Sequence, residues 1–194
     1  MNRKPAPMDS PEPPRLLGLP PIVSSNTRLL VLGSFPGAAS LARQQYYAHP
    51  QNQFWKILQA IWPSSPCIDC VSSYEKRSEW LLARGVGVWD VYASCERQGS
   101  LDTAIRNAQV NDFVGLARRC PQLRAIAHNG GESFKHARHV IASFSAAGLP
   151  ALPVYKLPST SPAHASWTFE RKLDAWREVV TVACPRPRTT SQGR

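Results

Sequence analysis

The chain has 194 residues, of which 43% are hydrophobic, enough for one globular domain with a buried core. No apolar run approaches the ~20 residues of a membrane-spanning helix. The first residues, MNRKPAPMDSPEPP, lack the apolar stretch of a secretory signal. We therefore expect a cytoplasmic protein without membrane contact, associated with the nucleoid if its source is bacterial.

Basic side chains outnumber acidic ones, with 23 Lys and Arg against 13 Asp and Glu, which gives a formal net charge of +10. Residues 1–20 carry three basic and two acidic side chains, and residues 184–194 carry three arginines, so about +6 belongs to the segment between them. A basic folded body indicates a polyanionic partner, and nucleic acid is the first candidate.

The five cysteines do not have the spacing of a metal site. Cys67 and Cys70 form one Cys-x-x-Cys pair in a Pro/Ser-rich stretch, and the other three cysteines stand alone. A structural zinc or iron–sulfur site usually takes four ligands from two close pairs. Paired metal-binding carboxylates are also missing from the sequence. We therefore expect reduced thiols, no metal and no cofactor.

Proline content divides the chain into a single domain with two flanking segments. Residues 1–21 hold seven of the 18 prolines and are expected to be disordered. The basic tail at 184–194 is expected to be disordered as well. The domain is therefore predicted at residues 22–183.

Apolar patterns within this domain predict alternating strands and helices. In chain order we predict a strand at 29–32, helices at 54–62 and 75–84, a strand at 86–91, a helix at 112–119, a strand at 123–127, a helix at 132–144, a strand at 153–157 and a helix at 168–182. This alternation indicates an α/β fold, a three-layer α/β/α sandwich with a central four-stranded, mainly parallel sheet.

Each predicted strand ends in a segment with the composition of a turn: GSFPG, WDVYAS, HNGG and LPSTSP in chain order. The carboxyl ends of parallel strands meet at one edge of the sheet, where open α/β folds bind ligands. A dense polar and aromatic stretch, QQYYAHPQNQFW, follows the first turn. Its flat rings and amides suit a planar, hydrogen-bonding ligand such as a nucleobase.

These motifs, in this order, resemble the uracil-DNA glycosylase superfamily, and within it the hypoxanthine-DNA (deoxyinosine) glycosylase branch. The resemblance covers residues 26–180. It implies a monofunctional hydrolase of base excision repair that binds damaged DNA, double- or single-stranded. Such an enzyme flips out a deaminated base, hypoxanthine or uracil, and hydrolyses its N-glycosidic bond. A monomer is expected, because the enzyme must slide along a duplex.

Two standard catalytic positions of this family carry apolar residues here. The third residue of the GSFPG motif is often Asp or Asn in relatives and positions the attacking water, but here it is Phe35. The first residue of the last loop is His or Asn in many relatives, but here it is Leu157. The resemblance instead implies Asn52 of HPQNQFW as the catalytic position, with Asp90 reading the base edge or orienting water. A helix N-cap is the structural alternative for Asn52, and a loop cap is the alternative for Asp90.

The remaining candidates form two groups. A glycine that lets the backbone approach the ligand, with flat rings and amides around it, would bind the base. Small hydroxyls and a helix start would bind DNA phosphates. Ordinary core aromatics and tight turns are the structural alternatives for both groups. The base-binding candidates are Gly33, Ser34, Phe35, Tyr46, Tyr47, His49 and Asn129, and the DNA-binding candidates are Gly130, Ser159, Thr160, Ser161 and His164.

Three other functions fit parts of the pattern. The first is a mismatch-specific uracil/thymine-DNA glycosylase of the same fold. The second is a DNA-binding module that has lost catalysis, an idea motivated by Phe35 and Leu157. The third is a hydrolase of free nucleosides, against which the basic charge argues.

Overall fold

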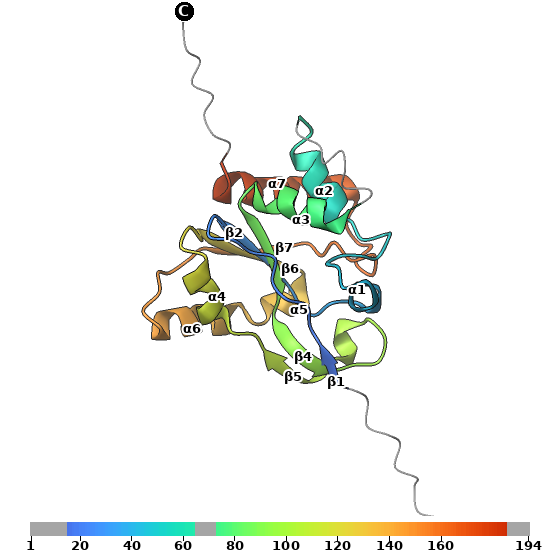
Figure 1. The fold of residues 1–194 in the computed structure, drawn as a ribbon. Helices are drawn as coiled ribbons and strands as arrows, with labels where there is room; N and C mark the ends of the chain where they lie inside the picture. Colours follow the sequence, from blue (N-terminus) through green and yellow to red (C-terminus); the bar gives the residue numbers. More distant parts are fainter. Residues whose placement is uncertain (1–14, 65–72, 186–194) are drawn as a thin grey trace, which may run out of the picture.

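The computed structural model describes residues 15–64 and 73–185 and is built around a four-stranded parallel sheet with strand order β3-β2-β6-β7 (Figure 1). Each strand pairs in parallel with its neighbours, so all four carboxyl ends lie at the same edge. The predicted sheet is confirmed. Its strands are β2 (Leu29–Gly33), β3 (Val86–Asp90), β6 (Ala125–Asn129) and β7 (Val154–Leu157).

The central strand β2 is an uninterrupted apolar run because helices cover both faces of the sheet. Leu29 and Val31 face one hydrophobic cluster, and Leu30 and Leu32 face the other; all four are 0% exposed. Figure 1 shows α2 (Phe54–Ile61), α3 (Tyr74–Leu82) and α7 (Phe169–Ala183) together on the first face. The second face carries α4 (Phe113–Arg119) and α6 (Ala137–Ala146).

Two short helices lie near the carboxyl edge of the sheet. They are α1 (Ala38–Arg43), which the sequence analysis did not predict, and α5 (Gly131–Phe134). The single helix predicted at 132–144 is therefore wrong in part, because the helix is interrupted at Lys135 and His136, between α5 and α6. Within the described ranges, no helix is long and apolar enough to cross a membrane.

A second, antiparallel sheet with order β1-β4-β5 was not predicted. Its strands are β1 (Arg15–Leu17), β4 (Tyr92–Glu96) and β5 (Arg106–Val110). The prediction of a turn at VYAS is wrong, since β4 continues almost directly from β3. The expected disorder is also wrong for residues 15–21, because β1 pairs with β4 and Leu19 is buried. That pairing joins segments about 80 residues apart, which proline content does not reveal.

Residues 1–14 and 186–194, and Cys67 with Cys70, lie outside the described residues. Cys184, predicted to begin a disordered tail, is instead buried, and its thiol donates to the Gly85 carbonyl at 3.5 Å. In the described part of the chain Cys95, Cys120 and Cys184 are all free and buried thiols.

Candidate active site

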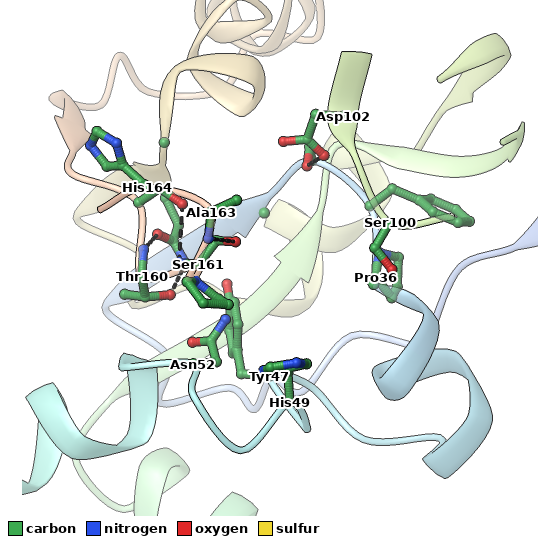
Figure 2. Close-up of a pocket in the computed structure, with 18 of the residues that line it drawn as sticks. Pro36, Tyr47, His49, Asn52, Ser100, Asp102, Thr160, Ser161, Ala163 and His164 are labelled. Atoms are coloured by element: carbon green, nitrogen blue, oxygen red, sulfur yellow. Dashed lines mark hydrogen bonds between the residues drawn. The ribbon is translucent and has the colours of Figure 1, made fainter. Parts of the chain in front are cut away.

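The carboxyl ends of the four parallel strands open into one cavity of about 1000 Å³. Gly33, Asp90, Asn129 and Leu157 each end one strand, and all four line this cavity. Figure 2 shows three groups of side chains around it: Tyr47, His49 and Asn52; Thr160, Ser161, Ala163 and His164; and Pro36, Ser100 and Asp102. The structure therefore brings together residues from distant parts of the sequence at the predicted edge of the sheet.

Asp90 is a buried carboxyl group in the floor of the cavity. Asp90 is 4% exposed, and its Oδ2 atom has no hydrogen-bond partner among the described residues. Burial raises the pKa of Asp90 to about 7. Its Oδ1 atom lies against the Cα atom of Gly33, where any side chain would collide with it. Glycine is therefore required at position 33 by this close approach.

Tyr47 places a second unpaired polar atom beside the same glycine. Its hydroxyl lies 3.6 Å from the position that a Gly33 Cβ atom would take, and it too is buried without a partner in the described part of the chain. Figure 2 shows this hydroxyl directed into the cavity. Burial raises the pKa of Tyr47 and keeps the hydroxyl protonated. The ring is held from behind by Phe54, with ring centroids 4.0 Å apart.

Unpaired buried polar groups cost free energy unless a ligand supplies the missing hydrogen bonds. The Asp90 carboxyl and the Tyr47 hydroxyl are two such groups at the bottom of one cavity. The floor is therefore suited to a ligand with a polar edge.

The GSFPG loop forms one wall through its backbone and through Ser34. The Ser34 hydroxyl donates to Asp102 Oδ1 at 2.6 Å. The ring of Phe35 packs in the core below Arg97, whose guanidinium carbon lies 5.0 Å from the ring centroid. Arg97 also donates to the Pro36 carbonyl at 2.5 Å. The Phe35 ring thus has packing partners in the core, and because the residue also lines the cavity, its contact with a base stays a prediction.

Hydrogen bonds from three side chains, one on β6 and two on α7, fasten the loop that follows β7, residues 158–164. Asn129 donates from Nδ2 to the Thr160 hydroxyl, and its Oδ1 accepts from the Thr160 backbone N–H, both at 2.9 Å. From α7, Trp176 donates to the Pro158 carbonyl at 3.1 Å and Lys172 donates to the His164 carbonyl at 2.8 Å. These bonds connect the loop to β6 and to α7.

Two predicted contact residues are used in fastening that loop. Thr160 is 0% exposed, so its side chain is hidden from a DNA phosphate, contrary to the prediction. The amide of Asn129, which was predicted to bind the base, forms hydrogen bonds with Thr160 through both its nitrogen and its oxygen. The common reason is that β6 and the loop after β7 lie side by side, a contact that the sequence pattern does not specify.

Gly130 is also a structural residue. Its φ of +108° suits glycine, and a Cβ atom there would lie 3.0 Å from the Ser159 Cβ atom. Its backbone N–H donates to the carbonyls of His128 and Leu157, both at 3.0 Å. The Gly130 N–H is therefore already paired within the protein, and the predicted phosphate contact at this helix start would need another donor.

Other predicted DNA-contact residues remain on the cavity wall. The hydroxyl oxygens of Ser159 and Ser161 accept backbone N–H groups of Ser161 and Ala163, which leaves the hydroxyl hydrogens to donate. His164 is half-buried, and burial lowers its pKa, so its ring is neutral at pH 7. These three side chains can donate hydrogen bonds to an anion at the loop.

Asn52 has a capping contact and a free amide group. Its Oδ1 accepts from the Phe54 backbone N–H at 3.0 Å at the start of α2, as the N-cap alternative predicts. Its Nδ2 has no partner among the described residues and lies on the cavity wall between Tyr47 and Ser161 (Figure 2). The capping bond therefore leaves the amide N–H groups available to a ligand. His49 is exposed, and its Nδ1 accepts from the Gln51 N–H at 3.2 Å.

Tyr46 belongs to the core as well as to the wall. It is 3% exposed, its hydroxyl donates to the Leu19 carbonyl at 3.1 Å, and its own carbonyl accepts from Trp55 Nε1 at 3.1 Å. Burial raises its pKa. Its polar groups are therefore paired within the protein, and the core-aromatic alternative describes it.

Asp102 and Trp167 are among the cavity side chains that were not predicted. Asp102 lies between β4 and β5 and reaches Ser34, 68 positions earlier in the chain. Trp167 lines the cavity and is covered by Arg171, whose guanidinium carbon lies 3.8 Å from the ring centroid. The spacing of Trp167 and Arg171, one helical turn apart, was the one local signal available. Nothing local indicated Asp102.

The site can bind a polar edge at its floor, a planar group against Tyr47, and an anion at the loop. Among the residues that the structure describes, no three His, Cys, Asp or Glu side chains form a group that could hold a metal ion.

Comparisons with known proteins agree with this description. A family model described as the uracil DNA glycosylase superfamily matches residues 20–180. The chain is 38% identical over 117 residues to a hypoxanthine DNA glycosylase of Methanosarcina barkeri, covering 60% of this chain and 72% of the relative. It is 39% identical over 114 residues to the protein of the same name from Methanosarcina acetivorans, covering 58% and 70%.

A solved structure shares the fold. The solution NMR structure of a candidate uracil DNA glycosylase from Methanosarcina acetivorans superposes with a TM-score of 0.71 at 31% identity, covering 87% of this chain and 98% of the other. The range of the family model, residues 20–180, contains the four parallel strands and the residues that line the cavity. This chain therefore belongs to the uracil DNA glycosylase superfamily.

Proposed function

We propose that this protein is a monofunctional DNA glycosylase that removes deaminated bases from DNA, with hypoxanthine first and uracil second. It hydrolyses the N-glycosidic bond and leaves an abasic site for base excision repair. Membership of the superfamily and the two hypoxanthine DNA glycosylases among its relatives support this function. Damaged DNA as the partner, a monomeric state and a cytoplasmic location are parts of the same proposal.

The proposed substrate class rests on Asp90 in the floor of the cavity, whose Oδ2 atom has no hydrogen-bond partner among the described residues. Hypoxanthine and uracil each have a ring N–H beside a carbonyl on the Watson–Crick edge. Adenine and cytosine have an unprotonated ring nitrogen at that position. In its ionised form the Asp90 carboxylate accepts from the N–H and is repelled by the bare nitrogen, so it favours the deaminated base over its parent.

Asn52 is the proposed catalytic residue. Hydrolysis passes through a transition state that resembles an oxocarbenium ion, with negative charge on the departing base. The Asn52 amide N–H groups, which the capping bond leaves free, can donate to that charge. Phe35 and Leu157 are both buried in the hydrophobic core, so neither side chain contributes polar chemistry. Stabilisation of the leaving base thus rests on the floor and on Asn52.

The rim of the cavity is proposed to hold the DNA backbone. Ser159, Ser161 and His164 have hydrogen-bond donors on the fastened loop, and Lys156 lines the same wall. Backbone contacts of this kind position the strand without reading its sequence. The damaged base then enters the cavity at the cost of unpairing, which is smallest at a mispaired lesion.

The test is a glycosylase assay on labelled duplexes that contain one deoxyinosine, deoxyuridine or deoxyxanthosine, followed by alkali to cleave abasic sites. The wild type should cleave the deoxyinosine duplex. Asn52→Asp keeps an oxygen to cap Phe54 but loses the amide donors, so its excision rate should fall by about 10²-fold or more while DNA binding is retained. Gln51→Ala, an exposed neighbour, is the matched control and should match the wild type.

The other outcomes separate the alternatives. Cleavage of uracil opposite guanine with deoxyinosine untouched would favour a mismatch-specific enzyme. Salt-sensitive binding without cleavage of any duplex or single strand would favour a DNA-binding module. Loss of binding together with excision in Asn52→Asp would assign that residue to folding or positioning.

A further inference from the structure

The cavity contains a second carboxyl group, Asp102, that the preceding proposal does not use. Asp102 begins a short 3₁₀ helix, Asp102–Ala104, and is half-buried on the cavity wall. Its Oδ1 accepts from the Ser34 hydroxyl at 2.6 Å. Among the described residues, Ser34 is the one hydrogen-bond donor to this carboxyl group, so Oδ2 is left to bind something else.

The position of Asp102 differs from that of Asp90. Within the described residues these two are the acidic side chains that line the cavity. Asp90 lies in the floor against Gly33, where the proposed function places the edge of the base. Asp102 is bound to Ser34, one residue beyond that floor, and lies across the cavity from Asn52 (Figure 2).

A substrate in this cavity needs a group that holds water. With the base on the floor and the phosphates at the serine loop, the sugar carbon C1′ lies between them. Phe35, which occupies the usual water-holding position in the GSFPG loop, turns its ring into the core. Asp102 is hydrogen-bonded to Ser34, the neighbouring residue of the same loop, and it lines the same cavity.

We infer that Asp102 binds the attacking water and accepts its proton, an assignment that rests on the proposed glycosylase function. The water oxygen forms a bond to C1′ while the C1′–N bond breaks. The electron pair of that bond leaves with the base, and the water proton passes to Asp102 Oδ2. Solvent protonates the departed base and later receives the proton from Asp102, so the enzyme is restored.

The electrostatic surroundings suit a carboxylate that accepts a proton. Burial raises the pKa of Asp102, which makes it a stronger base than an exposed aspartate, and the negative charge of Glu132 acts in the same direction. The hydrogen bond from Ser34 and the positive charges of Arg97 and Lys135 act against this and favour the ionised form. The titratable and charged groups that face Asp102 are Asp90 on β3, Tyr92 and Cys95 on β4, Arg97 after β4, and Glu132 and Lys135 at α5.

Asp102→Asn is the informative variant because an asparagine Oδ1 still accepts from Ser34. The single-turnover rate of deoxyinosine excision should fall by about 10²-fold or more, the size of a general-base contribution. The Kd for a duplex whose lesion carries a 2′-fluoroarabino sugar, which resists cleavage, should stay within about threefold of the wild type. Asp112→Asn makes the same chemical change at the cap of α4 and should leave both quantities unchanged.

A second variant separates chemistry from structure. Asp102→Ala should lose excision like Asp102→Asn, and added formate should restore part of the rate by replacing the missing carboxylate. An Asp102→Asn rate within about threefold of the wild type would overturn the inference, as would an equal loss of rate and binding. Failure of the wild type to excise any base would instead overturn the proposed function. The wild-type rate is therefore measured before those of the variants.

Discussion

Replacing Asp90 by asparagine should make the protein more stable at alkaline pH than at acidic pH, relative to the wild type. The reason is that Asp90 is an ionisable group in the cavity floor whose Oδ2 has no partner in the described part of the chain. Asparagine has nearly the same shape and no charge. The substitution therefore removes the cost of burying a carboxylate with little change in packing.

The magnitude follows from the pKa of Asp90, which burial raises from 3.8 to about 7. Between those two values the folded protein holds a proton that the unfolded chain has lost, so the free energy of unfolding falls as pH rises. The contribution of Asp90 is thus most favourable below pH 4 and is lost as pH rises to about 7. From pH 5 to pH 8 about two pH units of this window are crossed, at about 1.4 kcal/mol each. The advantage of Asp90→Asn should therefore grow by about 3 kcal/mol.

Urea denaturation of both proteins at pH 5 and pH 8 measures this quantity. The difference between the two differences cancels the titration of every other group that the substitution leaves alone. An advantage that stays constant with pH, or that shrinks as pH rises, would show that Asp90 does not titrate near neutrality in the folded protein. A confirmed increase would show that the wild type retains a destabilising carboxyl group in its cavity, as functional sites often do.

Two further substitutions test the architecture of the site. Gly33→Ala should place a Cβ atom against Asp90 Oδ1, lowering stability by about 1–3 kcal/mol and excision by tenfold or more, measured by denaturation and by the glycosylase assay. An unchanged excision rate would show that the floor is not rigid. Asn129→Ala should leave buried polar groups of Thr160 unpaired, with a stability loss of about 1–3 kcal/mol and reduced excision of every lesion by a similar factor. A change in the ranking of lesions would instead return Asn129 to base recognition.

The parallel sheet was predictable because its strands carry their own signals. LLVL at 29–32 is a continuous apolar run, and turn residues follow β2, β6 and β7. These patterns are local, and parallel strands buried on both faces require them. The edge at which the site lies then follows from geometry, since parallel strands direct all their carboxyl ends to one side. The sequence also showed, through Phe35 and Leu157, that two usual polar positions are occupied by apolar residues.

Other features depended on contacts between distant segments, which leave no local pattern. Strand β1 forms because Arg15–Leu17 pairs with an edge of β4, although the residues around it are rich in proline. The roles of Asn129 and Thr160 in fastening a loop could be seen only once β6 and the end of β7 were adjacent.

By itself the sequence determined the sheet, the edge of the sheet that holds the site, the family resemblance and a set of candidate residues that all line the cavity. The tertiary structure alone decided which of those residues are free to act and which are already bonded to the protein. Asp102 is the sharpest case, because a loop without a recognisable motif becomes part of the site only when folding brings it to Ser34. The physical reason is that strand propensity and burial are properties of short segments, whereas hydrogen-bond pairing and desolvation depend on what the rest of the chain places nearby.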